Sequence, residues 1–220
     1  ELFLGGNRAA QSHCHHWHGQ RCRYCFRHHQ PPIEPVNGTP ADCVKVAIHS
    51  ILDEKPDLVV SGINMGANIG TNILYSGTVS AANLGTMLGI PSIAFSLDAL
   101  RKGDFSASKP ITQNISTIVI EKGLPTGTLL NVNIPNCNSS DMQGYKVTEQ
   151  GTEFWEDWLE SREDPRGRKY FWMTGNRLNA DDSMDLDGYA IANNYVSLTP
   201  IHYKLTNESF IPELKTWEMK

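Results

Sequence analysis

The fold is decided by the stretch DLVVSGINMGANIGTNILYSGTVSAANLGTML, residues 57–88. It opens with a β-branched run that stops at Gly62, which predicts a buried strand of a parallel sheet. A loop rich in glycine and asparagine follows, and residues 77–88 are predicted to form a helix. The alternation continues with a predicted strand, helix and strand at residues 91–97, 111–122 and 129–135. This β-α-β-α-β series predicts an α/β fold with a parallel sheet, right-handed crossovers and helices on its faces.

The regions on either side of this series also contain signals for secondary structure. Thr39, Pro40 and Asp42 have the residue types of an N-cap, a first-turn proline and an acidic capping partner, so a helix is predicted to begin there. Beyond Gly144 the alternation gives way to strand-like segments, which predict an appended β element; they are residues 145–150, 167–175 and 193–203. The charged stretch 156–168 and the acidic stretch 181–187 are expected to separate these segments.

Composition limits the class of protein. The chain has 220 residues, of which 40% are hydrophobic and 20% charged, so one main globular domain is expected. Its net charge of −5 argues against a protein that holds a nucleic-acid polymer through its phosphates. No apolar run approaches the length of a membrane span, and the first ten residues lack the order of a signal peptide. We therefore expect a cytoplasmic protein with no membrane partner.

Residues 13–29 differ in composition from the rest of the chain, because they hold six of the eight histidines and three of the five cysteines. One interpretation is a zinc-binding module built around the C-x-x-C pair Cys22 and Cys25. The other is a segment that is too poor in aliphatic residues to build a core. Structural zinc motifs separate their ligand pairs by about a dozen residues, so the crowded spacing favours the second interpretation.

Residues 61–78 are the candidate site, since ligands of open α/β sheets bind beyond the carboxyl ends of the strands. Ser76, Gly77 and Thr78 are placed where a helix begins, so hydroxyls and free N–H groups would converge on an anion. The phosphate-binding G-x-x-x-x-G-K-[ST] and the dinucleotide-binding G-x-G-x-x-G are both absent. The alternative is a plain Gly/Asn-rich connection in which Ser76 is only an N-cap. Composition alone does not decide between the two.

Several segments in order resemble the SurE family of 5′-nucleotidases. They are GTPADCV (38–44), SGINMGANIG (61–70), YSGTVSAA (75–82), GIPSIAFS (89–96), LLNVNIP (129–135), DPRGRKYFW (164–172) and YVSLTPIHYKLT (195–206). The resemblance implies a Rossmann-like three-layer sandwich with a mostly parallel sheet and a C-terminal β-hairpin and arm that build homodimers or homotetramers. It also implies a divalent metal, Mg²⁺ or Mn²⁺, and hydrolysis of nucleoside 5′-monophosphates, with 3′-monophosphates as a second class of substrate.

The family's site residues transfer to matching positions of this chain. The resemblance makes Asn64 and Ser12 metal ligands, and it makes Asn68, Ser76, Gly77 and Thr78 phosphate-binding residues. Family members also carry an Asp-Asp-Gly triplet whose aspartates hold the metal, and this chain has none before Asn64. We therefore expect an N-terminally truncated or altered metal-site region. The alternative function is a weak or inactive relative that still binds nucleotide or phosphate.

The expected organisation has three parts: an atypical segment at 1–35, an α/β nucleotidase core at 36–143, and a hairpin with an oligomerisation arm at 144–220. The acidic run 181–188 does not have the register of a calcium loop and is expected to be a solvated turn. His202 is expected to be structural. The aromatic residues of the C-terminal part are expected to pack hairpins or subunits rather than stack a nucleobase; they are Phe154, Trp155, Trp158, Phe171 and Trp172.

Overall fold

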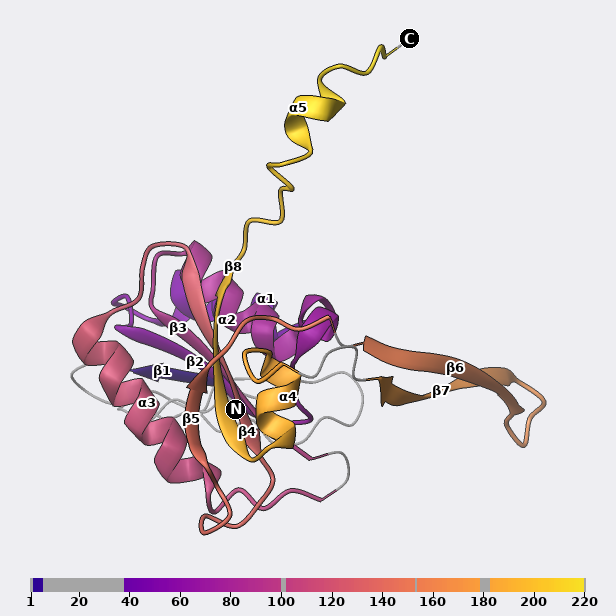
Figure 1. Ribbon diagram of the computed structural model, residues 1–220, viewed down its shortest axis with the longest axis horizontal. Helices are drawn as coiled ribbons and strands as arrows, with labels where there is room; N and C mark the ends of the chain where they lie inside the picture. Colours follow the sequence, from indigo (N-terminus) through magenta and orange to yellow (C-terminus); the bar gives the residue numbers. More distant parts are fainter. Residues whose placement is uncertain (1, 6–37, 100–101, 153, 179–182, 220) are drawn as a thin grey trace.

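The structure is a computed structural model that describes residues 2–5, 38–99, 102–152, 154–178 and 183–219. Its centre is a six-stranded sheet of order β1-β2-β3-β4-β8-β5 (Figure 1). These strands are β1 (Leu2–Gly5), β2 (Leu58–Met65), β3 (Ser92–Asp98), β4 (Thr128–Pro135), β5 (Gly144–Val147) and β8 (Tyr195–His202). The pairs β2–β3, β3–β4 and β5–β8 are parallel, whereas β1–β2 and β4–β8 are antiparallel. The predicted α/β fold with a mostly parallel sheet is confirmed.

Helices cover both faces of this sheet (Figure 1). The helices of the described ranges are α1 (Pro40–Val46), the π-helical turn η1 (Ala47–Ile51), the 3₁₀ helix η2 (Gly70–Tyr75), α2 (Gly77–Met87), α3 (Ser108–Lys122), α4 (Asp187–Ala192) and α5 (Ile211–Leu214). Of these, α5 lies on the C-terminal arm and does not cover the sheet. None of the helices in the described ranges is long and apolar enough to cross a membrane.

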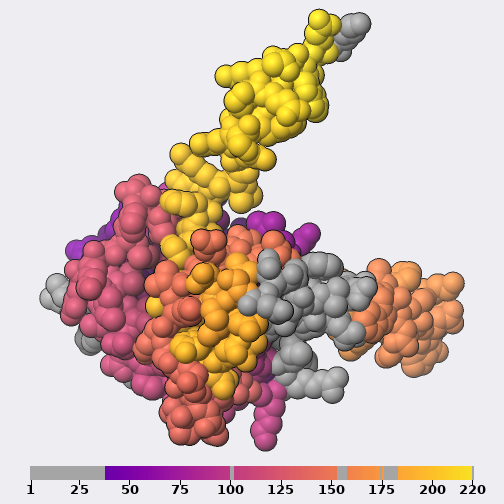
Figure 2. Space-filling view, viewed as in Figure 1, coloured from indigo at the N-terminus to yellow at the C-terminus, as the bar shows by residue number. Residues whose placement is uncertain are grey.

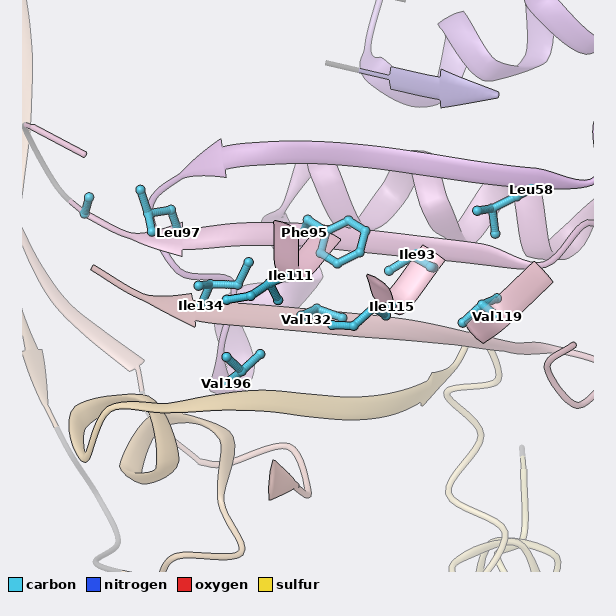
Figure 3. Close-up of a cluster of buried hydrophobic side chains, with 11 residues drawn as sticks. Leu58, Ile93, Phe95, Leu97, Ile111, Ile115, Val119, Val132, Ile134 and Val196 are labelled. Carbon is cyan, nitrogen blue, oxygen red and sulfur yellow. The ribbon is translucent and has the colours of Figure 1, made fainter. Parts of the chain in front are cut away.

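The larger core lies between the sheet and α3. Ile111, Ile115 and Val119 follow one another at intervals of four residues, so one stripe of α3 faces the strands. They pack on Phe95 and Val132, which are fully buried (Figure 3). Because side chains alternate along a strand, the residues between these apolar positions of β3 and β4 point to the opposite face.

The opposite face is covered by α1 and α2. The predicted start of α1 is confirmed: the Thr39 side chain accepts a hydrogen bond from the Asp42 N–H, and Asp42 accepts one from the Thr39 N–H. Cys43 and Val44 of this helix pack with Val59 of β2. This helix therefore packs its apolar residues against the sheet, and it continues into the π-helical turn η1.

Strands β6 (Phe154–Glu163) and β7 (Lys169–Leu178) form a separate hairpin. The hairpin and the C-terminal arm, residues 203–219, extend away from the main body (Figures 1 and 2). Both carry exposed apolar side chains, among them Phe171 (64% exposed), Met173 (68%) and Leu205 (77%). The proposed boundary at residue 144 stays a prediction, and β5 and β8 lie in the central sheet.

Several expectations need correction. β2 was expected to stop at Gly62 but continues to Met65 through an irregularity in its pairing. The charged stretch 156–168 was expected to separate strands, but its residues 156–163 are part of β6, because a two-stranded hairpin accommodates charged side chains on its exposed surface. The strand β1 lies in a region for which no regular structure was expected.

Candidate functional site

The candidate site lies at the carboxyl edge of the parallel strands. β2, β3 and β4 end at Met65, Asp98 and Pro135, and parallel strands place these ends at one edge of the sheet. Residues 66–76, which we call the substrate loop, leave β2 at this edge and lead into α2. The predicted position of the loop is therefore confirmed by the strand order.

A bulge in β2 sets the position of Asn64. Ser61 pairs with Ala94 and Asn64 pairs with Ser96, so β2 contains one more residue than β3 between these pairs. Gly62 lies in the bulge at φ 128°, and a Cβ there would collide with the carbonyl oxygen of Phe95. Bulges commonly redirect side chains next to functional sites. Here the bulge brings Asn64 into register with Ser96.

The Asn64 side chain is of the right type for a hard cation. Its Nδ2 donates to the Gly66 carbonyl at 2.8 Å, which leaves Oδ1 as the oxygen that could face a metal. Mg²⁺ and Mn²⁺ prefer oxygen ligands, but a single neutral amide lacks the charge needed to hold them. The described part of the chain contains no group of three or more His, Cys, Asp or Glu side chains that could complete the site. Ser12, the second predicted ligand, lies outside the described residues.

Asn68 is held tightly inside the substrate loop. Its backbone N–H donates to Asn133 Oδ1 at 2.8 Å, and its carbonyl accepts from Asn131 Nδ2 and Asn133 Nδ2 at 2.8 and 2.9 Å. Its own Nδ2 donates to Ser96 Oγ. The structure thus assigns much of the hydrogen-bonding capacity of Asn68 to the protein interior, and its role in binding phosphate stays a prediction.

Gly70, two residues further along the substrate loop, is held from the other half of the chain. Its N–H donates to Asp187 Oδ2 at 3.0 Å, and its carbonyl accepts from Gln150 Nε2 at 3.0 Å. Asp187 is 0% exposed and also accepts from the N–H of Gly151. The acidic run was expected to be a solvated turn, and for Asp187 this is wrong. Backbone N–H groups of distant segments surround the carboxylate, and these replace its hydration.

The start of α2 has the features predicted for an anion-binding helix end. Ser76 is its N-cap, and its Oγ accepts from the Val79 N–H at 3.1 Å. The N–H groups of Gly77 and Thr78 are in the first turn, where no preceding carbonyl can accept them within the helix. A Cβ on Gly77 would lie 3.1 Å from Pro40 Cγ, so glycine allows α1 to approach this end of α2.

The remaining candidates lie away from this edge or outside the described residues. His202 pairs with Thr128, the first residue of β4, and is therefore at the opposite edge of the sheet. Trp158, Phe171 and Trp172 are exposed on the hairpin, and the Arg162 guanidinium lies 5.5 Å from the centre of the Trp172 ring. The Cys/His-rich run 13–29 is outside the described residues.

The site residues missed by sequence reasoning are those that hold the loop: Ser96, Asn131, Asn133, Gln150 and Asp187. One signal for two of them was present, because Asn131 and Asn133 alternate with apolar residues and must share one face of a strand. No comparable local signal marked Asp187, because Gly70 and Gly151, two of the residues that donate to it, are 117 and 36 residues away in the sequence.

Comparisons with known proteins agree with this geometry. The family model described as "Survival protein SurE" matches residues 6–157. A protein of Chlorobium phaeobacteroides named 5′-nucleotidase SurE is 48% identical over 185 residues, which cover 84% of this chain and 72% of the relative. Its namesake in Syntrophobacter fumaroxidans is 46% identical over 184 residues, 84% of this chain and 74% of the relative.

A solved structure is also similar to this chain. The crystal structure of the SurE protein from Aquifex aeolicus superposes with a TM-score of 0.70 at 41% identity. It covers 82% of this chain, and the match spans 73% of the Aquifex chain. The segment matched by the family model, residues 6–157, includes the substrate loop and the start of α2. On the strength of the family model and these identities, the chain belongs to the SurE family.

Proposed function

We propose that this protein is a 5′-nucleotidase, a phosphomonoesterase that hydrolyses nucleoside 5′-monophosphates to nucleoside and phosphate. The observation that carries the proposal is that the end of β2, which bears Asn64, and the loop leading to the Ser76-capped start of α2 both lie at the carboxyl edge of the sheet. The names of the similar proteins support the same activity. We include 3′-monophosphates as a second class of substrate.

The chain's own groups would bind and orient the phosphate. The first-turn N–H groups of Gly77 and Thr78, together with the Thr78 hydroxyl, can donate to phosphate oxygens, and the positive end of the helix dipole favours their charge. Hydrolysis breaks the bond between phosphorus and the ester oxygen, adds a hydroxyl from water to phosphorus and leaves a proton on the nucleoside. Donors fixed before the reaction stabilise the charge on the phosphoryl oxygens.

We propose Mg²⁺ or Mn²⁺ as the cofactor, with Asn64 and Ser12 among its ligands. Such a metal would supply a more acidic bound water and neutralise phosphate charge. The Asn64 amide fits this role by its oxygen, but the described residues contain no group of three or more His, Cys, Asp or Glu side chains that could hold a cation with it. The alternative function, a weak or inactive relative that binds nucleotide or phosphate, follows from this deficit.

Phosphate release from AMP, measured with Mn²⁺, with Mg²⁺ and with EDTA, tests the proposal. Metal-dependent release that EDTA abolishes would support the nucleotidase. Binding of AMP or phosphate by calorimetry without release would favour the alternative. If the protein neither releases phosphate from AMP nor binds AMP or phosphate, both functions are excluded.

We also propose that the protein assembles into homodimers or homotetramers through the β6–β7 hairpin and the C-terminal arm. The exposed apolar side chains on both elements support this, because soluble monomers seldom carry so many on projecting segments. The expected cytoplasmic location and the three-part division of the chain stay predictions.

A further inference from the structure

The substrate loop and the base of the hairpin meet at one carboxylate. Asp187 Oδ2 accepts from the Gly70 N–H at 3.0 Å, and Asp187 Oδ1 accepts from the Gly151 N–H at 2.9 Å. Gly70 begins η2 in the substrate loop, whereas Gly151 lies just before β6. We call residues 149–152 the hairpin root. One side chain therefore joins two segments about eighty residues apart in the chain.

A second side chain makes the same connection. Gln150, within the hairpin root, donates from Nε2 to the Gly70 carbonyl at 3.0 Å. The Asp187 N–H in turn donates to the carbonyl of Glu149 at 3.0 Å. The Gly70 residue is thus held at its N–H and at its carbonyl by groups tied to the hairpin root.

Burial of the Asp187 carboxylate costs free energy, so this arrangement depends on defined hydrogen-bond donors. Asp187 is 0% exposed, and a buried carboxylate is tolerated only when hydrogen bonds replace its hydration. Donors to it come from Gly70, Gly151 and Gly188, three backbone groups that must all be in place. A shift of the hairpin root would break a bond to this charge unless Gly70 moved with it.

The connection leads directly to the proposed phosphate site. η2 runs from Gly70 to Tyr75 and is followed at once by Ser76, the N-cap of α2. β6 also contacts η2. The position of the Gly70 peptide therefore sets the path of the chain into the first turn of α2.

We propose that Asp187 is a positioning residue that ties the hairpin root to the substrate loop, with Gln150 as its second link. Through this connection, the base of the hairpin fixes the geometry of the phosphate site, although the hairpin itself extends away from the body of the protein. We call the hydrogen bonds that join the hairpin root to Gly70 through Asp187 and Gln150 the tie. The effect of the tie on the phosphate site rests on the proposed nucleotidase function, whereas the tie itself does not.

Three variants isolate the tie. Asp187→Asn keeps the shape of the side chain but replaces one acceptor oxygen with an NH₂ group that faces a backbone N–H. Gln150→Ala removes only the exposed second link and should fold even if Asp187→Asn does not. Ser197→Ala is the matched control, because this buried hydroxyl bonds to Thr148 and Thr199 and not to the substrate loop.

Hydrogen exchange followed by mass spectrometry measures the tie without any need for activity. In both Asp187→Asn and Gln150→Ala, exchange should become faster in residues 66–76 and in the hairpin root together, by about tenfold in the aspartate variant. Ser197→Ala should leave both segments unchanged. Unchanged exchange in both segments of a folded Gln150→Ala, or acceleration in one segment alone, would overturn the tie.

Binding of inorganic phosphate by calorimetry and the kinetics with AMP measure the functional consequence. We expect about tenfold weaker phosphate binding in Asp187→Asn and about threefold in Gln150→Ala, with less than additive losses in the double variant because both act on Gly70. Lower melting temperatures with unchanged phosphate affinity and KM would reduce Asp187 to a stability residue and overturn the functional part. A wild type that neither binds phosphate nor hydrolyses AMP would instead refute the proposed function, and the exchange result would still decide the tie.

Discussion

The Asn133 side chain holds the peptide groups of Asn68 on both sides, as a neighbouring strand would. Its Oδ1 accepts from the Asn68 N–H at 2.8 Å, and its Nδ2 donates to the Asn68 carbonyl at 2.9 Å. A side-chain amide on β4 thereby replaces the backbone partner that a loop residue lacks. Both residues are buried, so water cannot substitute for these bonds.

Asn133→Leu should therefore destabilise the protein although leucine has a similar volume. The substitution leaves the Asn68 N–H without its acceptor, and we expect a loss of about 1–3 kcal/mol in the free energy of unfolding. Urea unfolding measures it. Thr199→Val, which removes a buried hydroxyl that does not contact the loop, is the control. Equal midpoints for Asn133→Leu and wild type would contradict the role of this amide.

Two substitutions at the start of α2 should separate stability from binding. Ser76→Ala removes the N-cap acceptor of the Val79 N–H and should cost about 1 kcal/mol of stability. Thr78→Val removes only a hydroxyl in the first turn, so stability should change little. Its affinity for phosphate should fall by about 1–3 kcal/mol through loss of a charge-assisted bond. Calorimetry with phosphate decides, and equal affinities would remove Thr78 from the site.

The capping box of α1 should make stability depend on pH in the acidic range. Hydrogen bonds from the Thr39 backbone N–H and hydroxyl lower the pKa of Asp42 below its ordinary value of 3.8. A lowered pKa in the folded state means that the carboxylate stabilises the fold above its unfolded pKa, and that this contribution is lost as the pH falls through the folded pKa.

Asp42→Asn provides the comparison. The variant should be less stable than wild type at about pH 6, and the gap should shrink as the pH falls towards about 2. Thermal melts across this range measure the gap. A gap that stayed constant over the whole range would show that the charge of Asp42 does not contribute.

Some of these features could be predicted from sequence because their causes are local. The capping box of α1 depends on residues three apart, and the alternating strands and helices are each encoded within one segment. β6 was missed because its charged residues resemble a loop, and its pairing with β7 depends on a partner strand. The role of Asp187 could not be predicted, since its buried carboxylate accepts hydrogen bonds from N–H groups at positions 70 and 151, which are distant in the sequence. Sequence identifies a carboxylate, but only the fold shows whether water reaches it.

The projecting elements should make the protein at least dimeric. Phe171 and Met173 on the hairpin are 64% and 68% exposed, and Leu205 on the arm is 77% exposed. Light scattering at micromolar concentration should give at least twice the monomer mass. Phe171→Glu with Met173→Glu should lower that mass if the hairpin mediates assembly, whereas Leu205→Glu tests the arm. A monomeric wild type would contradict the proposal.

The metal prediction concerns Asn64, whose Nδ2 is used by the Gly66 carbonyl and whose Oδ1 could face a cation. Asn64→Ala should lower Mn²⁺-dependent phosphate release by about ten- to a hundredfold while inorganic phosphate still binds, because the phosphate donors belong to α2. Asn64→Asp should retain more activity than Asn64→Ala, since a carboxylate offers the same oxygen with added charge.

The sequence before Asn64 also lacks the two aspartates of an Asp-Asp-Gly triplet, which would add charged metal ligands. No Asp-Asp-Gly triplet precedes Asn64, so metal-dependent hydrolysis by the chain should be much slower than in a relative that has the triplet. Replacing residues 1–35 with a segment that ends its first strand in Asp-Asp-Gly and restores a normal second strand should raise phosphate release from AMP, and EDTA should abolish the gain. Mn²⁺ binding followed by electron paramagnetic resonance provides a readout that is independent of turnover. If the original chain binds Mn²⁺ as tightly as the replaced one and turns over at the same rate, other residues hold the metal and the role of the missing aspartates is refuted.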